Sequence, residues 1–260
     1  MKFFLRTTVR FLLALFIIPK NIALYLLGCR GSNKSEIVDA LCTQGFYLYN
    51  EPVSAIDVEK LKSIYSDMFS KSDVKQSGQL NGRIMMPHLN SDAIRSYIDK
   101  FIPVARDYFN NKSIQVELSM FQKSKVETED DNIPGGGYHM DDNKKNLKFF
   151  IYLTDVTDKN GPFILSPNSH GINLFKIIRW FGWEITTKRK YLYMDELPKG
   201  SSAPIPVLGK AGTIFCGDTT IYHKAARVIE GERLVLVISF AERRLDPYKY
   251  LFNGKKKSLY

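Results

Sequence analysis

The chain has 260 residues, 44% of them hydrophobic, and a formal net charge of +10 from 37 Lys and Arg against 27 Asp and Glu. This hydrophobic content excludes a globally disordered chain and supports one large domain or two small ones. The positive charge favours anionic partners such as membrane headgroups or acidic substrates, but no nucleic-acid-binding motif accompanies it. The three cysteines are odd in number and widely separated, which argues against a disulfide scaffold and suits a reducing compartment.

Residues 1–30 form a hydrophobic and basic segment. Its apolar runs, 11–18 and 22–27, are separated by Pro19 and Lys20, and each is shorter than a helix that spans a bilayer. Arg6 and Arg10 lie four residues apart among apolar side chains, which is typical of a helix at a membrane surface. A signal peptide, including a weak lipobox ending at Cys29, and a helix packed on the domain are the alternatives. Peripheral membrane association is therefore one of three open interpretations of this segment.

The part of the chain from residue 33 to about residue 109 is expected to be mainly helical. Apolar residues at helical spacing predict helices over 35–41, 52–69 and 91–109, the last interrupted at Pro103, with a short strand at 45–49. Nothing in this part carries catalytic chemistry by itself. We therefore expect the helices to support a site that lies further along the chain.

The second half of the chain has the pattern of a β structure. Alternating apolar and polar residues predict a strand over 114–120, and further strands are expected at 147–156, 163–165, 211–216 and 233–240. A loop at 123–137 and a turn at 158–162 separate them. An aromatic and basic insert at 171–206 could receive a substrate, touch lipid headgroups or form a packed helix. Short strands without regular intervening helices favour a sandwich or barrel, in a single domain over 33–260.

One pair of residues in this half has the spacing of metal ligands. His139 and Asp141 lie two residues apart just before a predicted strand, so on an extended chain their side chains face the same way. A second histidine would complete a triad of two histidines and one carboxylate, which leaves three coordination positions open for non-haem Fe(II) oxygen chemistry. His223 is the best candidate, and the other two histidines are His88 and His170.

Arg233 opens an apolar strand ten residues after His223. A buried arginine is expected to have an anionic partner, because an unpaired interior charge is costly. Its planar guanidinium can hold a carboxylate through two hydrogen bonds. The sequence therefore predicts an iron site with a clamp for an acidic cosubstrate nearby.

Over residues 114–242 the chain resembles the phytanoyl-CoA dioxygenase family of Fe(II)- and 2-oxoglutarate-dependent oxygenases. The motifs that carry the resemblance are His139-x-Asp141, the strand at 147–156, the Asn160-Gly161-Pro162 turn, the segment 166–170, the segment 217–223 and Arg233. The resemblance implies a double-stranded β-helix, or jelly roll, buttressed by helices. It also implies Fe(II) as cofactor, with 2-oxoglutarate and O2 as cosubstrates.

By position, the resemblance makes His139, Asp141 and His223 the iron ligands and assigns Arg233 to the distal carboxylate of 2-oxoglutarate. It also places three further residues near the cosubstrate: Tyr152, Met120 and Gln122. Ala225 departs from the family, because relatives often carry a hydroxyl-bearing residue there, so a hydroxyl contact to 2-oxoglutarate from this position is absent. Related halogenases replace the carboxylate with a small residue, so Asp141 implies hydroxylation, with release of succinate and CO2.

The sequence leaves the substrate and two rival functions open. The net charge, the insert and the N-terminal segment favour a small anionic or lipid-linked substrate, with Lys148 and Trp180 as candidate contacts. Lys148 could instead extend from a strand edge to solvent. A non-catalytic jelly-roll binding module at a membrane surface, or a Zn²⁺ hydrolase with the same triad, would use the same residues differently. Because ferrous iron and 2-oxoglutarate belong to the cytosol, we expect a cytoplasmic protein, at the inner face of the membrane if residues 1–30 attach it.

Overall fold

The structure is a computed structural model that describes residues 35–71, 82–126, 137–141, 145–171 and 196–241, together with positions 176, 178, 179, 182 and 194. The N-terminal segment 1–30 and Trp180 lie outside the described residues, so the expectations for them are not tested. Within the described ranges, none of the helices combines the length and apolar character that a bilayer crossing needs.

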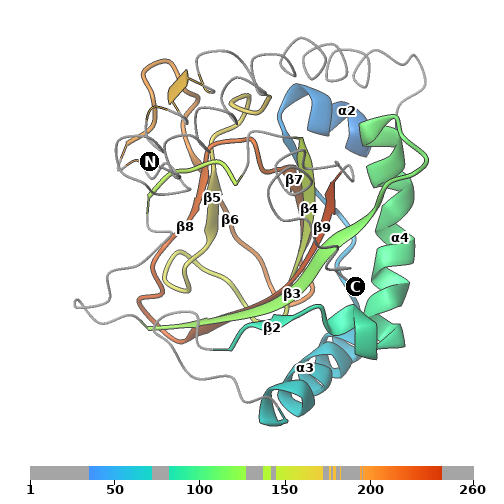
Figure 1. Cartoon of the computed structure of the whole chain (residues 1–260). Helices are drawn as coiled ribbons and strands as arrows, with labels where there is room; N and C mark the ends of the chain where they lie inside the picture. The colour runs from blue at the N-terminus through green and yellow to red at the C-terminus, as the bar shows by residue number, and fades with distance from the viewer. Residues whose placement is uncertain are drawn as a thin grey trace, which may run out of the picture.

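Two antiparallel sheets form the body of the molecule. The larger has six strands in the order β1-β7-β4-β9-β3-β2, and the smaller has three in the order β6-β5-β8. The strands are β1 Phe46–Leu48, β2 Ile84–Met85, β3 Gln115–Lys125, β4 Asn146–Tyr152, β5 Phe163–Leu165, β6 Ile205–Val207, β7 Ile214–Asp218, β8 His223–Ala225 and β9 Glu232–Ala241. The two sheets face each other (Figure 1), as the sandwich expected from the sequence requires.

The strand boundaries differ from the sequence expectation at several places, of which β3 and β4 are two. β3 continues to Lys125, so the first residues of the expected 123–137 loop belong to a strand that pairs with β9. β4 ends at Tyr152, four residues before the predicted end at 156. Both differences arise because hydrogen bonding to the neighbouring strand, which the local pattern does not report, decides where a strand ends.

In the described part of the chain, three α-helices and a short 3-10 helix precede the long strands. They are α2 Glu36–Thr43, α3 Ala55–Ser70, η2 Pro87–Asn90 and α4 Asp92–Phe109. The Ser35 side chain caps α2 by accepting from the Val38 amide at 3.4 Å, and the Ser54 side chain caps α3 by accepting from the Asp57 amide at 3.1 Å. Each cap satisfies one of the amides that a helix start leaves without a partner in the helix.

The expected interruption at Pro103 is wrong, because α4 runs through it as one helix. A proline inside a helix costs about 3 kcal/mol, mainly through one lost hydrogen bond and a clash with the preceding turn. The opposite side of α4 is a continuous apolar face, and its burial outweighs that cost. Its buried residues are Ile94, Ile98, Phe101, Ala105, Tyr108 and Phe109.

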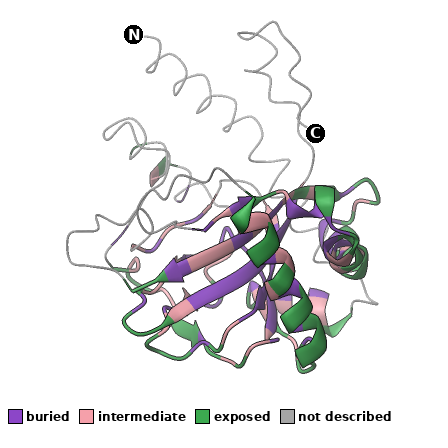
Figure 2. Ribbon diagram, turned by 90° about the horizontal axis from the view of Figure 1, so that it is seen from below, coloured by how far each residue is buried: buried purple, intermediate pink, exposed green. Residues whose placement is uncertain are grey.

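The two faces of β4 belong to two different hydrophobic clusters. Leu147, Phe149 and Ile151 pack toward the helices, and the Phe149 ring stacks on Phe101 of α4 at a centroid distance of 4.3 Å. Phe150 and Tyr152 point the other way, into the cluster between the sheets. Figure 2 shows this division, with buried residues along the strands and exposed residues on the outer side of the helices. The helices therefore cover one face of the larger sheet and leave its inner face to the site.

The cysteines differ from the expectation at one position. Cys42 is disulfide-bonded, although the cysteine pattern gave no sign of it. Cys216, on β7, is a free thiol and is completely buried. The oxidation state of a cysteine depends on its compartment and on spatial neighbours, which a count of three cysteines does not determine.

Candidate metal centre

His139 and His223 lie opposite each other on neighbouring extended segments. Each donates its backbone N–H to the carbonyl of the other at 2.9 Å, so residues around His139 extend the smaller sheet beyond β8. The amide of Asp141 donates to the Thr219 carbonyl at 3.0 Å, which fixes the chain two residues further on. Residues paired across an antiparallel ladder, and residues two apart on one strand, share a face. All three side chains therefore meet on one side.

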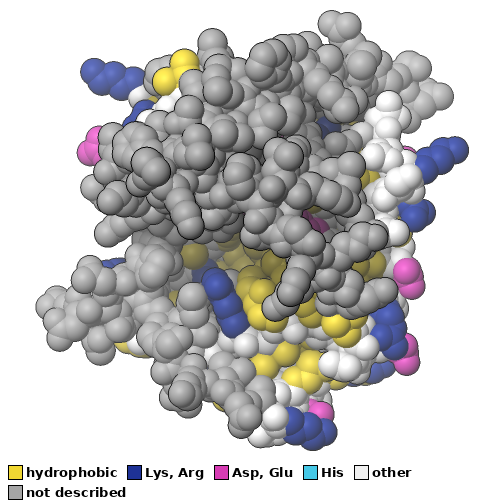
Figure 3. Space-filling model, in the orientation of Figure 1, with side chains coloured by type: hydrophobic (Ala, Val, Ile, Leu, Met, Phe, Trp, Pro, Cys, Tyr) yellow, Lys and Arg dark blue, Asp and Glu magenta, His cyan; other side chains and the backbone are white. Residues whose placement is uncertain are grey.

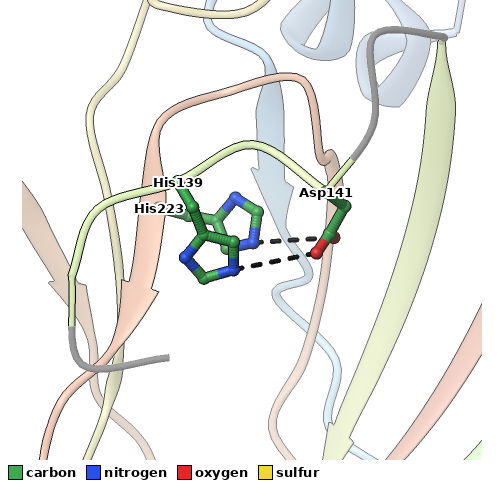
Figure 4. Close-up of side chains that lie close together, drawn as sticks. All are labelled: His139, Asp141 and His223. Carbon is green, nitrogen blue, oxygen red and sulfur yellow. Dashed lines mark ion pairs between the residues drawn. The ribbon is translucent and has the colours of Figure 1, made fainter. Parts of the chain in front are cut away.

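The three side chains form a compact ligand set. The Nε2 atom of His139 lies 3.8 Å from Oδ1 of Asp141, and the Nε2 atom of His223 lies 3.5 Å from Oδ2 of the same carboxylate. One ligand atom from each residue can be chosen so that all lie within 4.8 Å of one another. Figure 4 shows both imidazoles directed at the Asp141 carboxylate. Because bonds from nitrogen and oxygen to a divalent transition metal are about 2.0–2.2 Å long, one ion fits among these atoms with small adjustments.

Backbone carbonyls fix the tautomer of both imidazoles. Nδ1 of His139 lies 3.0 Å from the Gly137 carbonyl, and Nδ1 of His223 lies 2.9 Å from the Ile221 carbonyl. A carbonyl oxygen can only accept, so in each neutral ring Nδ1 carries the proton and Nε2 presents its lone pair. Orientation of a ligand histidine by a hydrogen bond to its other nitrogen is typical of protein metal sites.

The protonation states at neutral pH also suit a metal. Burial, followed by the neighbouring His223, lowers the pKa of His139 to about 4. Burial by itself would raise the pKa of Asp141, but the Lys148 ammonium and the two histidines together hold it well below the usual range. At pH 7 His139 is therefore neutral and Asp141 is ionised, as metal ligands must be.

Lys148 lies beside the triad. Lys148 lies two and four residues before Phe150 and Tyr152 on β4, so its side chain points to the same inner face as theirs. Its Nζ lies 2.8 Å from Oδ2 of Asp141. The alternative of a lysine extending from a strand edge to solvent is wrong, because its side chain is only 19% exposed. The alternation of side chains along the strand predicted the inward direction, but only the tertiary structure shows that Lys148 pairs with Asp141.

Arg233 is buried on the same inner face of the larger sheet, opposite Ser124 of β3. One guanidinium nitrogen donates to the Gly161 carbonyl and another donates to the Ser124 hydroxyl at 3.3 Å. Only Pro162 separates Gly161 from Phe163, whose ring stacks on His223 at a centroid distance of 5.0 Å. Arg233 and the triad are therefore linked through residues 161–163, the segment that leads into β5.

Tyr152 connects the two sheets through its hydroxyl. The hydroxyl donates to the Val207 carbonyl at 3.0 Å and accepts from the Phe163 amide at 3.3 Å. Met120 and Gln122 of β3 lie on the same inner face, on the far side of β9, where they pair with Val237 and Val235, respectively. These three candidates share the face of Arg233, but the Tyr152 hydroxyl already has two backbone partners.

Phe163 and Gly161 are site-forming residues that the sequence did not single out. Phe163 packs on the ring of His223 and on Phe150, at a centroid distance of 4.9 Å from the latter. Gly161 supplies the carbonyl that holds Arg233. The signal available was the Asn160-Gly161-Pro162 turn, which identified a turn but gave no indication of what its carbonyl binds.

Comparisons with solved structures identify the fold. The epimerase SnoN, solved with Fe3+, alpha ketoglutarate and nogalamycin RO, matches with a TM-score of 0.60 and 14% identity over 79% of this chain and 82% of SnoN. HygX from Streptomyces hygroscopicus, solved with nickel and 2-oxoglutarate, matches with a TM-score of 0.57 and 16% identity over 83% of this chain and 92% of HygX. EctD from S. alaskensis, solved with Fe, matches with a TM-score of 0.54 and 16% identity over 81% of this chain and 77% of EctD.

The chain has the double-stranded β-helix fold of these proteins. This confirms the fold that the sequence resemblance implied, with helices buttressing one side. No sequence-family model matches the chain, and a sequence comparison with curated proteins found no match. At identities of 14–16% the likeness establishes the fold, and the chemistry has to be argued from the site.

Proposed function

We propose that the chain is an Fe(II)- and 2-oxoglutarate-dependent oxygenase. The observation that carries the proposal is the triad itself, in which two tautomer-fixed imidazoles and one carboxylate bring their ligand atoms within 4.8 Å of one another. Its donor set, two nitrogens and one oxygen on one side of an ion, is that of non-haem Fe(II) oxygenases and leaves three positions open. The likeness to proteins solved with iron, nickel and 2-oxoglutarate supports this choice of metal and cosubstrate.

His139, Asp141 and His223 would hold the iron, and Arg233 would bind the distal carboxylate of 2-oxoglutarate. Bound Fe(II), with 2-oxoglutarate and O2, supplies the oxidation of an unactivated carbon, with release of succinate and CO2. Arg233 is suited to a carboxylate because its guanidinium is buried and held in place by the Gly161 carbonyl. Met120, Gln122 and the Tyr152 ring would border the cosubstrate from the same sheet face. The two facing sheets would exclude water from it.

Hydroxylation is the proposed outcome, because Asp141 fills the position that a halide would need. Other oxidative outcomes depend on how a substrate is placed, and similar structures include an epimerase and a carbocyclase. The proposed substrate is a small anionic or lipid-linked molecule. Figure 3 shows hydrophobic side chains gathered at the middle of the described surface, with charged side chains mainly toward its edge. Trp180 and residues 1–30 stay proposed contacts for substrate and membrane.

We propose a cytoplasmic location, at the inner face of the membrane if residues 1–30 attach the protein there. Ferrous iron and 2-oxoglutarate favour this compartment. The disulfide at Cys42 speaks against it, because the cytosol keeps thiols reduced. The test traps free thiols at the moment of cell lysis and analyses the peptide containing Cys42 by mass spectrometry. A trapped Cys42 thiol supports the cytoplasmic location, and a disulfide contradicts it.

The decisive experiment measures the iron and the cosubstrate together. Wild-type protein with Fe(II) and 2-oxoglutarate under anaerobic conditions should develop a visible charge-transfer absorption, and on admission of air it should release succinate. Asp141→Ala should lose both signals. Asp155→Ala is the matched control, because Asp155 is also paired with a lysine at 2.8 Å but lies on the exposed surface.

The same experiment defines how the proposal fails. Undiminished succinate release by Asp141→Ala would show that the triad does not hold the catalytic metal. Binding of Zn²⁺ with no response to 2-oxoglutarate would favour a hydrolase, and the absence of any metal response in folded wild-type protein would favour a binding module.

A further inference from the structure

Lys148 is the one described lysine or arginine whose ion pair involves a triad carboxylate. On β4 it lies between Gly217 of β7 and Ser239 of β9 in the sheet register. Both neighbours are small, and a side chain added at Gly217 would meet nothing closer than 3.5 Å. The aliphatic part of Lys148 therefore has room beside the strand, and its ammonium reaches Oδ2 of Asp141 at 2.8 Å.

This ion pair differs from the surface pairs of the molecule in its exposure. The side chains of Lys148 and Asp141 are 19% and 23% exposed, whereas those of Lys210 and Asp155 are 88% and 52% exposed at the same 2.8 Å separation. Water and salt screen the surface pair almost completely. A charge in the less hydrated interior acts more strongly on its neighbours, including an ion placed among the triad atoms.

The lysine changes the charge that a metal meets. Histidines that ligate a metal are neutral and a ligating carboxylate is ionised, so the three ligands would carry a net charge of −1, and the Lys148 ammonium would bring the group to neutrality. A divalent ion bound there would then leave a net charge of +2 inside the protein. Such a charge is costly unless an anion accompanies it.

We propose that Lys148 couples retention of the metal to binding of an anionic co-ligand, and that it positions the Asp141 carboxylate while doing so. The inference rests on the proposed function and names a regulation of the same site. A carboxylate has about four lone-pair positions, so Asp141 accepts the lysine hydrogen bond and still offers an oxygen to a metal. Lys148 disfavours the bare metal and favours the complex with a dianion such as 2-oxoglutarate.

Replacement of Lys148 by methionine removes the charge and keeps much of the shape. Two effects then oppose each other: the metal no longer meets a neighbouring cation, and Asp141 loses a group that orients it. Because the interaction with a doubly charged ion exceeds the cost of freeing one carboxylate rotation, the electrostatic effect wins. We expect Lys148→Met to bind Mn²⁺ alone at least about tenfold more tightly, and 2-oxoglutarate to the manganese complex at least about tenfold more weakly.

The experiment is a titration of Mn²⁺ followed by electron paramagnetic resonance, with and without 2-oxoglutarate, on wild-type protein and three variants. Lys148→Arg keeps the charge and should retain the wild-type dependence on 2-oxoglutarate. Lys210→Met removes the exposed lysine and should match the wild type in both affinities. Lys148→Gln, which is neutral but can still donate a hydrogen bond, replaces Lys148→Met if the latter has a lowered melting temperature, and the same shifts are expected.

The outcomes separate this inference from the proposed function. If wild-type protein binds no Mn²⁺ at the triad, the proposed function fails and the inference with it. If the wild type binds Mn²⁺ and 2-oxoglutarate but Lys148→Met behaves like Lys210→Met, only the inference is overturned. Weaker binding of both ligands by Lys148→Met would show that the lysine is merely structural, and would also overturn it.

Discussion

Substitution of Tyr152 by phenylalanine tests whether this residue serves the fold or the cosubstrate. Its hydroxyl donates to the Val207 carbonyl of β6 and accepts from the Phe163 amide of β5, and the side chain is 1% exposed. The variant keeps the ring but leaves two backbone groups without this partner in the interior between the sheets. We therefore expect a loss of stability and nearly unchanged binding of 2-oxoglutarate.

The magnitude follows from the two hydrogen bonds. A buried polar group left without a partner costs about 1–3 kcal/mol, so losing both hydrogen bonds should reduce the free energy of unfolding by about 2–6 kcal/mol. In a chain of this length each kcal/mol lowers the melting temperature by about 2–4 °C, which gives a shift of roughly 4–24 °C. Urea denaturation followed by circular dichroism measures the free energy, and a thermal scan measures the shift.

Tyr97→Phe is the control, because Tyr97 lies on α4, on the outer side of the larger sheet. Its side chain is only partly buried against the core, so loss of its hydroxyl should change stability by about 1 kcal/mol or less, which is below the effect expected at Tyr152. The reasoning about the sheet bridge is refuted if Tyr152→Phe is as stable as Tyr97→Phe while its affinity for 2-oxoglutarate falls. That result would instead make the hydroxyl a cosubstrate contact, as the family resemblance implied.

Two further predictions concern Gly161 and Cys216. Gly161 has φ +72°, and a Cβ there would lie 2.7 Å from the Ala226 carbonyl oxygen. Gly161→Ala should therefore destabilise the protein by about 2 kcal/mol or more. It should also weaken 2-oxoglutarate binding, because it would move the Gly161 carbonyl that holds Arg233. Gly200, with φ +84° but open space around it, is the control. Gly200→Ala should lower the free energy of unfolding by only about 1–2 kcal/mol in a denaturant titration and leave the affinity for 2-oxoglutarate unchanged. If both variants weakened 2-oxoglutarate binding equally, the role of the Gly161 turn in holding Arg233 would be contradicted. Burial raises the pKa of the Cys216 thiol. Iodoacetamide at pH 8 should therefore label Cys216 only after unfolding, which peptide mass spectrometry detects. Labelling of the native protein would disprove the burial of Cys216.

The residues of the triad could be identified from the sequence. His139 and Asp141 are two residues apart, and strand geometry alone predicts that their side chains share a face. The same alternation of side chains along a strand placed Lys148 and Tyr152 on one face of β4. The likeness of motifs then indicated the fold, because a few residues with fixed chemical tasks keep their order and approximate spacing even where the rest of the sequence differs.

The partners of these side chains were decided only by the tertiary structure. Opposition of His139 and His223 depends on a backbone pairing between residues 84 positions apart, which no local pattern encodes. The same holds for the ion pair of Lys148 with Asp141 and for the Gly161 carbonyl that holds Arg233. Local propensity also gave the wrong result at Pro103, where packing of the apolar face of α4 outweighed the cost of a proline. Periodicity fixes which way a side chain points, whereas long-range pairing of strands fixes what it meets.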